Sequence, residues 1–474
     1  MSCVFPPAPR CGIINVLTVN VVTLGQKSND EDGVAQKPLW IGNIHFPHGW
    51  VTDQTVKEVL ALITKAAKHR EHLLAKLKTA GKSSKASNAQ AAYLGSTLVR
   101  LDALIRAAKR LDYDEKLEVP QYEQIASQLK LYQPISEPVR VYLKKKSGNG
   151  YRYFCHFGVR HQAAQALVAD MINAQFQAKP FQYNTRGQGV AEAVKKIRQL
   201  YATGNGHFVR LDIKSFFDSF DHKATMQALP IAKDVTEHVA LGKHYQLHGQ
   251  KLSKEETPLQ ETLNQYISLI AEHGLPQGSA CSPAIANFFV SKIEPKLPKG
   301  ARFLNYVDDF LILAQSPERA QKAKNALTSS IEEMSVGKFE LLEKSSGSLH
   351  SEVEFLGHVF IGQPDGTFKV AVSPANVHKI MAWTAKEYES VTDKFKADQG
   401  KDWVSLNAMS AAVRFAHHIM SWLSTFSQAD DVGKHQKELF ERIATFALAT
   451  GQDTGKIVSL AKNMPLKDVG SYSG

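Results

Sequence analysis

Two adjacent carboxylates, Asp308 and Asp309, lie between two apolar runs in the segment FLNYVDDFLIL (303–313). Two like charges about 4 Å apart repel by roughly 1 kcal/mol in water and about 4 kcal/mol near a protein surface. The pair therefore needs solvent, a shared proton or a cation. Both runs are typical of short buried strands, so we expect a tight turn that holds the carboxylates at a sheet end. Asp residues are also common in turns, where they hydrogen-bond their own backbone, so the pair alone does not decide between a functional site and an ordinary turn.

A third carboxylate, Asp212, ends an apolar strand in HFVRLDIKSFFDSFDH (207–222). Three carboxylates from two strands could converge, and Mg²⁺ binds through a few carboxylates together with substrate phosphates. Two such ions about 3.5 to 4 Å apart stabilise the attacking and leaving oxygens of a phosphoryl displacement. Such ions would resolve the repulsion between the carboxylates.

Three motifs around these carboxylates carry a resemblance to a known family. LDIKSFFDSFDH with Asp212, then GLPQGSACSPAIAN (274–287), then YVDD (306–309) resemble, in this order, the palm of a reverse transcriptase. Upstream, VRVYLKKKSGNGYRYFCHFGVRHQAAQALVADMI and FQYNTRGQGVAEAV resemble the fingers of bacterial reverse transcriptases related to group II introns. Downstream, LLEKSSGSLHSEVEFLGHVF resembles the end of the palm, so the resemblance covers about half of the chain.

The resemblance implies a mixed α/β (α+β) right-hand polymerase with fingers, palm and thumb. An antiparallel palm sheet would carry the YVDD hairpin. We expect an N-terminal extension with a basic helical hairpin at 1–130, fingers at 131–205, a palm at 206–372 that returns to the fingers at 223–270, and a helical thumb and tail at 373–474.

The resemblance also implies roles for the acidic residues. Asp212, Asp308 and Asp309 would be catalytic and, with Ile213, would hold two Mg²⁺ ions, for which Mn²⁺ could substitute. Phe217, five positions after Asp212, matches a steric gate that favours deoxynucleotides; packing is the default role for any one phenylalanine of this segment, and only the spacing selects Phe217.

Further matches concern the nucleotide and the template. Gln277 and Gly278 resemble positions beside the incoming nucleotide, where a small residue permits close backbone approach, or they form a plain Pro-Gln-Gly turn. Lys145 and Arg152, on a Gly-tipped hairpin, are candidates for the triphosphate, and Arg152 suits bidentate phosphate binding. Lys344 matches a lysine near the leaving pyrophosphate. Arg186 matches a template-contacting arginine or is a helix-entry residue.

The overall charge supports a polyanionic partner. The chain of 474 residues has 57 Lys and Arg against 46 Asp and Glu, a net charge of +11 and a pI near 9.2. Nucleic acid fits better than a membrane because no run of 18 apolar residues exists. The apolar stretch at 12–24 has no basic segment before it and predicts a strand, not a signal peptide. Four distant cysteines form no metal-ligand pattern, so we expect a reduced, cytoplasmic protein.

Two periodic stretches predict a helical hairpin near the N-terminus. One helix is expected from Thr52 to Leu77 and another from Leu94 to Ala108. The hairpin is strongly basic, which favours either RNA contact or an ordinary solvated face. Its basic residues are Lys65, Lys68, Arg70, Lys76, Lys78, Lys82, Lys85, Arg100, Arg106, Lys109 and Arg110.

The resulting hypothesis is an RNA-directed DNA polymerase that copies a noncoding RNA from dNTPs. Neither an HNH-like cluster nor a ribonuclease H set follows residue 377, which favours an enzyme of bacterial antiphage defence, alone or with a second copy or an accessory protein. A retron or group II intron-derived enzyme, and an RNA-binding maturase or scaffold with secondary catalysis, remain alternatives.

Overall fold

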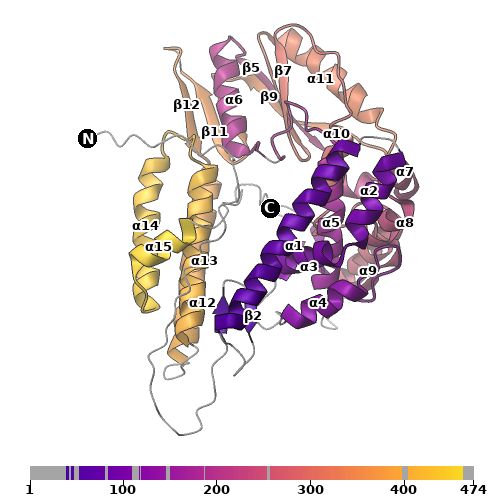
Figure 1. The fold of residues 1–474 in the computed structure, drawn as a ribbon. Helices are drawn as coiled ribbons and strands as arrows, with labels where there is room; N and C mark the ends of the chain where they lie inside the picture. Colours follow the sequence, from indigo (N-terminus) through magenta and orange to yellow (C-terminus); the bar gives the residue numbers. More distant parts are fainter. Residues whose placement is uncertain are drawn as a thin grey trace, which may run out of the picture.

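The computed structural model describes residues 39–41, 44–46, 53–80, 84–108, 117, 119–145, 150–185, 187–252, 257–363, 365–397 and 404–462. The predicted strand at 12–24, Cys3, Cys11 and Arg186 lie outside the described residues. Figure 1 shows the N-terminal helices on one side, the C-terminal helices on the other, and a four-stranded sheet beyond both.

The central sheet is antiparallel, with the strand order β7-β8-β5-β9. Its strands are β5 (His207–Ile213), β7 (Ala301–Tyr306), β8 (Asp309–Ala314) and β9 (Leu341–Ser348). Side chains on one face pack against α10 (Ser282–Val290) and α11 (Pro317–Glu332), and those on the other against α6 (Val190–Ala202). Because both faces are covered, β8 is a continuous apolar run, as expected for a strand buried on both sides.

A second sheet has the order β4-β3-β6 and one exposed face. Strand β3 (Pro138–Lys145) pairs with β4 (Tyr151–His156) in an antiparallel hairpin and with β6 (Gln246–Gly249) in parallel. Apolar and polar residues alternate along β3 and β4, which gives a buried and a solvated face. The remaining helices of this region are α5 (Val159–Gln175), α7 (His222–Ala228), α8 (Lys233–Val235) and α9 (Thr257–Glu272). Two short 3₁₀ helices, Phe216–Ser219 and Gly242–His244, and a π-helix, Thr236–Ala240, complete the region.

The third sheet joins the central region to the C-terminal helices. Strands β10 (Val353–Phe355), β11 (His358–Gly362) and β12 (Phe368–Val372) are antiparallel neighbours in this order. The chain continues directly into a bundle whose core contains Ile380, Phe415 and Phe446. Its helices are α12 (Pro374–Ala397), α13 (Val404–Thr425), α14 (Val432–Ala449) and α15 (Thr454–Lys462).

The N-terminal region differs in one respect from the predicted hairpin. The helix α1 (Asp53–Ala80) is followed by α2 (Ser84–Gly95) and α3 (Thr97–Ala108), so the predicted second helix is broken. The break lies at Ser96, whose hydroxyl accepts a hydrogen bond from Val99 N (3.4 Å), as a helix N-cap does. A short helix α4 (Val119–Gln128) and a small hairpin, β1 (Leu39–Ile41) and β2 (Ile44–Phe46), complete the described elements.

Three arginines of the predicted basic set are not on a solvated face. Arg70 and Arg106 pair with Asp102 of α3 and Asp170 of α5, at N–O distances of 2.7 to 3.5 Å. Arg100 Nε donates to Leu94 O at 2.7 Å. Arginine suits this use because its planar fork bonds two acceptors at once. These side chains therefore fasten α1 and α3 to α5.

Among the described helices, none combines the length and the apolar character that a membrane span requires. The mixed α/β class expected from the sequence is confirmed.

Candidate active site

The register of two strands brings two of the predicted carboxylates together. Asp212 of β5 lies directly opposite Asp309 of β8 in the antiparallel ladder. Side chains of opposed residues point to the same face, with Cβ atoms about 4.5 to 5.5 Å apart. Asp308 occupies the turn before β8, so all three carboxyl groups lie at the same end of the central sheet.

The turn that carries Asp308 has only two central residues, because Tyr306 pairs with Asp309. Val307, the first of them, has a φ of 59°. A β-branched residue rarely adopts this left-handed backbone, and such strain costs on the order of 1–3 kcal/mol. The turn is therefore held by its surroundings and not by its own preference.

Asn305 supplies part of that support. Its side chain is fully buried, and Asn305 Nδ2 donates to Val307 O at 2.9 Å. Ile213 N donates to Asp308 O at 3.1 Å from the neighbouring strand. Sequence reasoning did not single out Asn305, although a buried amide within an apolar strand is itself a signal.

The three carboxylates share an excess of negative charge. Burial, followed by the charges of Asp309 and Asp212, raises the pKa of Asp308 to about 7, whereas the charge of Arg152 opposes the shift. Burial also raises the pKa of Asp309. Like charges held together in this way are typical of functional sites.

Two basic side chains approach the carboxylates from the adjoining strands. Lys344 Nζ of β9 lies 2.9 Å from Asp212 Oδ2. Arg210 lies two residues before Asp212, on the same face of β5; its Nη2 is 3.6 Å from Asp309 Oδ1 and its Nη1 donates to Glu354 O of β10 at 3.0 Å. Sequence reasoning predicted Lys344 at this site but missed Arg210, for which spacing by two along a strand was an available signal.

The donor set fits a hard divalent cation. Asp212, Asp308 and Asp309 offer carboxylate oxygens, and a cation between them would relieve the repulsion that raises the pKa of Asp308. In the described part of the chain, no group of three or more His, Cys, Asp or Glu side chains is placed to hold a metal ion by itself. Mg²⁺ usually binds through one or two carboxylates together with substrate phosphates, so a full set of protein ligands is not required.

Comparison with known proteins identifies the segment that carries this site. Residues 143–360 match the family described as reverse transcriptase (RNA-dependent DNA polymerase). The central segment is thus similar to reverse transcriptase domains. The description of this family names an RNA-dependent DNA polymerase, and the family generally uses a divalent metal ion.

Solved telomerase structures also resemble the chain. Telomerase from Candida albicans in complex with a TWJ fragment of telomeric RNA has 12% identity and a TM-score of 0.29, over 70% of this chain and 65% of that one. Apo telomerase from Candida Tropicalis has 15% identity and a TM-score of 0.35, over 69% and 62%. The chain thus spans less than two thirds of the length of either telomerase. No curated protein matches the sequence.

Within the matched segment, Phe217 follows Asp212 by five positions, and its side chain packs partly against the core. Phe216 is 2% exposed and is the packing residue of this segment, whereas Phe217 is only half-buried. Its backbone O accepts a hydrogen bond from Leu275 N at 2.7 Å. Phe217 is thus fixed by the loop that leads to Gln277.

The structure places Gln277 and Gly278 between the catalytic segment and the β3–β4 hairpin. Gln277 Nε2 donates to Asp218 Oδ1 at 3.2 Å, and Gln277 O accepts from Cys155 N at 2.8 Å. Gly278 has a φ of +99°, and a Cβ there would collide with Cys155 O. Glycine is therefore required at this position because the backbone of Cys155 approaches closely. The resemblance implied a different cause, close approach beside the incoming nucleotide.

The predicted phosphate-binding residues have different surroundings. Arg152 is exposed on β4, and its charge opposes the rise in the pKa of Asp308. Lys145 lies opposite Tyr151 at the end of the hairpin, and no contact brings it to the carboxylates. Arg186 lies outside the described residues.

Proposed function

We propose that the chain copies a noncoding RNA into complementary DNA by phosphoryl transfer between the 3′-hydroxyl of a primer and an incoming dNTP. The observation that carries this proposal is the alignment of Asp212 with Asp309, with Asp308 in the adjoining turn. Phosphoryl transfer needs positioning and electrostatic stabilisation more than covalent chemistry, and this cluster offers both.

Asp212, Asp308 and Asp309, with the backbone at Ile213, would hold two Mg²⁺ ions, for which Mn²⁺ could substitute. When bound, the ions supply stabilisation of the attacking and leaving oxygens. Arg210 holds the carboxylate of Asp309 in place from β5. Lys344 and Arg152 bring positive charge to the site, where the phosphates and the departing pyrophosphate carry negative charge.

The exposed face of the β4-β3-β6 sheet carries side chains that suit the binding of a single-stranded template. Tyr142 and Phe154 are 37% and 48% exposed, which is unusual for aromatic side chains. Arg140, Lys144 and Arg152 alternate with them on the same face. Aromatic rings that stack on bases, interleaved with basic side chains that meet phosphates, are typical of surfaces that bind single strands. Phe154 also lies next to Gly278, close to the catalytic segment.

Helix α1 supports RNA binding outside the catalytic region. Five of its lysines are exposed, whereas its arginine pairs internally with Asp102 and Asp170. Exposed lysines bind phosphate backbone without regard to sequence. The exposed lysines are Lys57, Lys65, Lys68, Lys76 and Lys78.

The wider setting is proposed from the resemblance to bacterial enzymes alone. We propose a cytoplasmic enzyme of antiphage defence that works on an RNA encoded nearby, alone or with a second copy or an accessory protein. The fingers, palm and thumb boundaries given above belong to the same proposal.

Primer extension tests the catalytic part. Purified protein with an RNA template, a DNA primer, Mg²⁺ and dNTPs should extend the primer, and Asp308→Asn should lower the rate by about 10³-fold or more. Asp234→Asn, a change at an exposed carboxylate far along the chain from the site, is the matched control and should extend normally. Equal RNA processing by wild type and Asp308→Asn, without extension by either, would instead favour a scaffold.

The choice of sugar tests Phe217. Phe217→Ala should reduce the preference for dNTPs over rNTPs by about 10- to 200-fold, the range for the loss of one apolar contact surface. Phe216→Leu is the control, because it alters a core ring and should lower stability without changing the preference. An unchanged preference in Phe217→Ala would assign this ring to packing.

A further inference from the structure

The C-terminal helices are attached to the β10-β11-β12 sheet at a second point besides the chain itself. Strand β12 is an edge strand of that sheet. The loop between α13 and α14 covers this edge: Asp430 N donates to Val370 O at 2.7 Å, and Val370 N donates to Asp430 Oδ2 at 2.8 Å. Val372 N donates to Asp431 Oδ1 at 3.0 Å. Strand edges need such partners, and here the partner is the C-terminal bundle.

Arg198 of α6 binds at the contact between β12 and the α13–α14 loop, which we call the Arg198 joint. Its Nη1 donates to Phe368 O of β12 at 3.0 Å. Its Nη2 donates to Gln428 O at 3.0 Å and lies 2.6 Å from Asp430 Oδ1. One guanidinium thus binds β12 and the α13–α14 loop together, which the single ammonium of a lysine could not do in the same geometry. Tyr201, three residues later, stacks on Phe368 at 4.3 Å between ring centroids.

Helix α6 connects the Arg198 joint to the residues that support the turn of Asp308. Its apolar face, including Val194 and Ile197, packs against Leu311 and Leu313 of β8. Shortly before α6, Tyr183 N donates to Asn305 O at 2.9 Å, and Asn305 holds the turn of Asp308. With 13 residues, α6 is about 20 Å long. Figure 1 shows α6 beside both β5 and the strands β11 and β12.

We propose that Arg198 is a positioning residue that sets the C-terminal helices against the catalytic carboxylates through α6. This inference rests on the proposed polymerase function. A primer–template duplex held by those helices is presented to the carboxylates at a distance that α6 and the Arg198 joint define. Loosening the joint reduces the grip on the duplex and leaves the chemistry of a bound primer end intact.

The exposure of the joint separates this role from a contribution to folding. The side chains of Arg198 and Asp430 are 30% and 55% exposed. Ion pairs this exposed add little to the stability of a fold. The loss of Arg198 should therefore change duplex binding more than the unfolding temperature.

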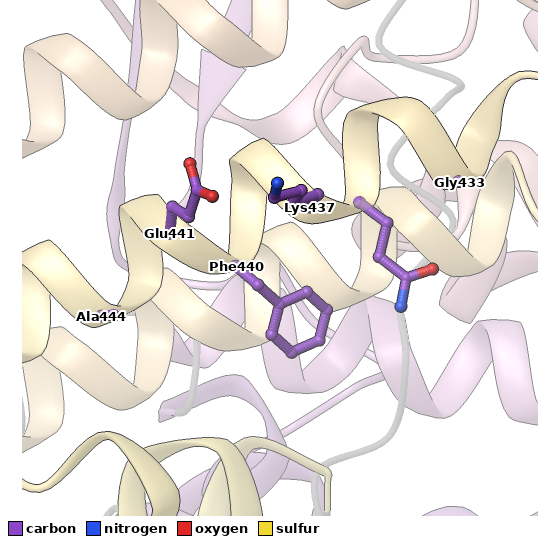
Figure 2. Close-up of a pocket in the computed structure, with 6 residues that line it drawn as sticks. Gly433, Lys437, Phe440, Glu441 and Ala444 are labelled. Carbon is purple, nitrogen blue, oxygen red and sulfur yellow. The ribbon is translucent and has the colours of Figure 1, made fainter.

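A pocket of about 540 Å³ lies along α14, where Figure 2 shows the side chains of Phe440 and Lys437 on the same helix. None of the site residues lines it, and nothing in the described chain indicates an occupant.

The experiment compares Arg198→Gln with Lys195→Gln, which removes an exposed charge from the same helix. We expect Arg198→Gln to raise the KM for primer–template about tenfold and to shorten products in the presence of a competitor, with kcat for the first nucleotide nearly unchanged, as when uniform binding is lost. Arg198→Lys should be intermediate, and Lys195→Gln should match wild type. Hydrogen exchange at Val370 and Val372 should accelerate in Arg198→Gln, with or without substrate.

Two results would overturn the inference. One is an Arg198→Gln variant with wild-type KM, product length and exchange; the other is a fall in kcat and in the unfolding temperature with KM unchanged, which marks a folding role. Both leave primer extension by wild type intact, so they are distinct from failure of the proposed function, in which wild type itself does not extend a primer.

Discussion

Two clusters of charged side chains in this chain are built differently. In the N-terminal helices, Arg70 and Arg106 face Asp102 and Asp170, so positive and negative charges are equal in number. Tyr93 adds a hydrogen bond to Asp170 Oδ2 at 3.0 Å.

At the end of the central sheet, three carboxylates lie close together and have two direct basic partners, Lys344 and Arg210. Arg210 also donates to the backbone of β10, and burial together with the charges of Asp309 and Asp212 raises the pKa of Asp308. The first cluster fastens helices together; the second keeps an excess of negative charge, which the proposed function would balance with a cation. The balance of charge, more than the presence of carboxylates, separates a structural cluster from a catalytic one.

The largest difference should appear when one carboxylate is neutralised in each cluster. Asp308→Asn should lower the rate of extension by about 10³-fold or more. It should leave the free energy of unfolding unchanged or raise it, because a repelled charge is removed. Chemical denaturation measured without divalent ions checks this. A clear loss of stability in Asp308→Asn would mean that its charge is balanced after all.

Asp102→Asn should behave in the opposite way. Removing one partner of a buried ion pair costs about 3–5 kcal/mol, and partial exposure of Arg70 and Arg106 should reduce this to about 2 kcal/mol. The same denaturation experiment measures it. The folded fraction should retain primer extension, so a selective loss of activity at full stability would break the comparison.

The smallest effect is expected at Arg210, which belongs to the catalytic cluster but touches β10 as well. Arg210→Met should lower kcat/KM for the nucleotide about tenfold, because displacement of Asp309 by a fraction of an ångström is costly at a catalytic site. Arg302→Met, a change on the edge strand β7, is a suitable control. Steady-state kinetics at saturating primer–template would show the difference, and equal values for the two variants would remove Arg210 from the site.

The sequence predicted the parts of this site that depend on local pattern. Adjacent carboxylates between two apolar runs predicted the turn, and the motif order indicated the family to which residues 143–360 match. The roles of Asn305 and Arg210 could not be predicted in the same way. They depend on the register of β5 against β8 and on the position of β10, which join residues far apart in the chain.

The N-terminal region shows the same limit. Helical spacing placed Arg70 and Arg106 on a basic surface, but Asp170, their partner, is 64 or more residues away. The break at Ser96 was a local signal, a glycine followed by a hydroxyl residue, and a closer reading of capping would have found it.

Removal of the N-terminal helices would break the ion pairs of the Arg70–Arg106 cluster. The family match begins at residue 143, but α5 within it carries Asp170, whose partners come from α1, α2 and α3. A fragment that starts after residue 130 would expose the apolar face of α5 and leave the carboxylate of Asp170 without Arg70 and Arg106. Fragments that begin before Asp53 should therefore stay in solution, whereas shorter ones should aggregate.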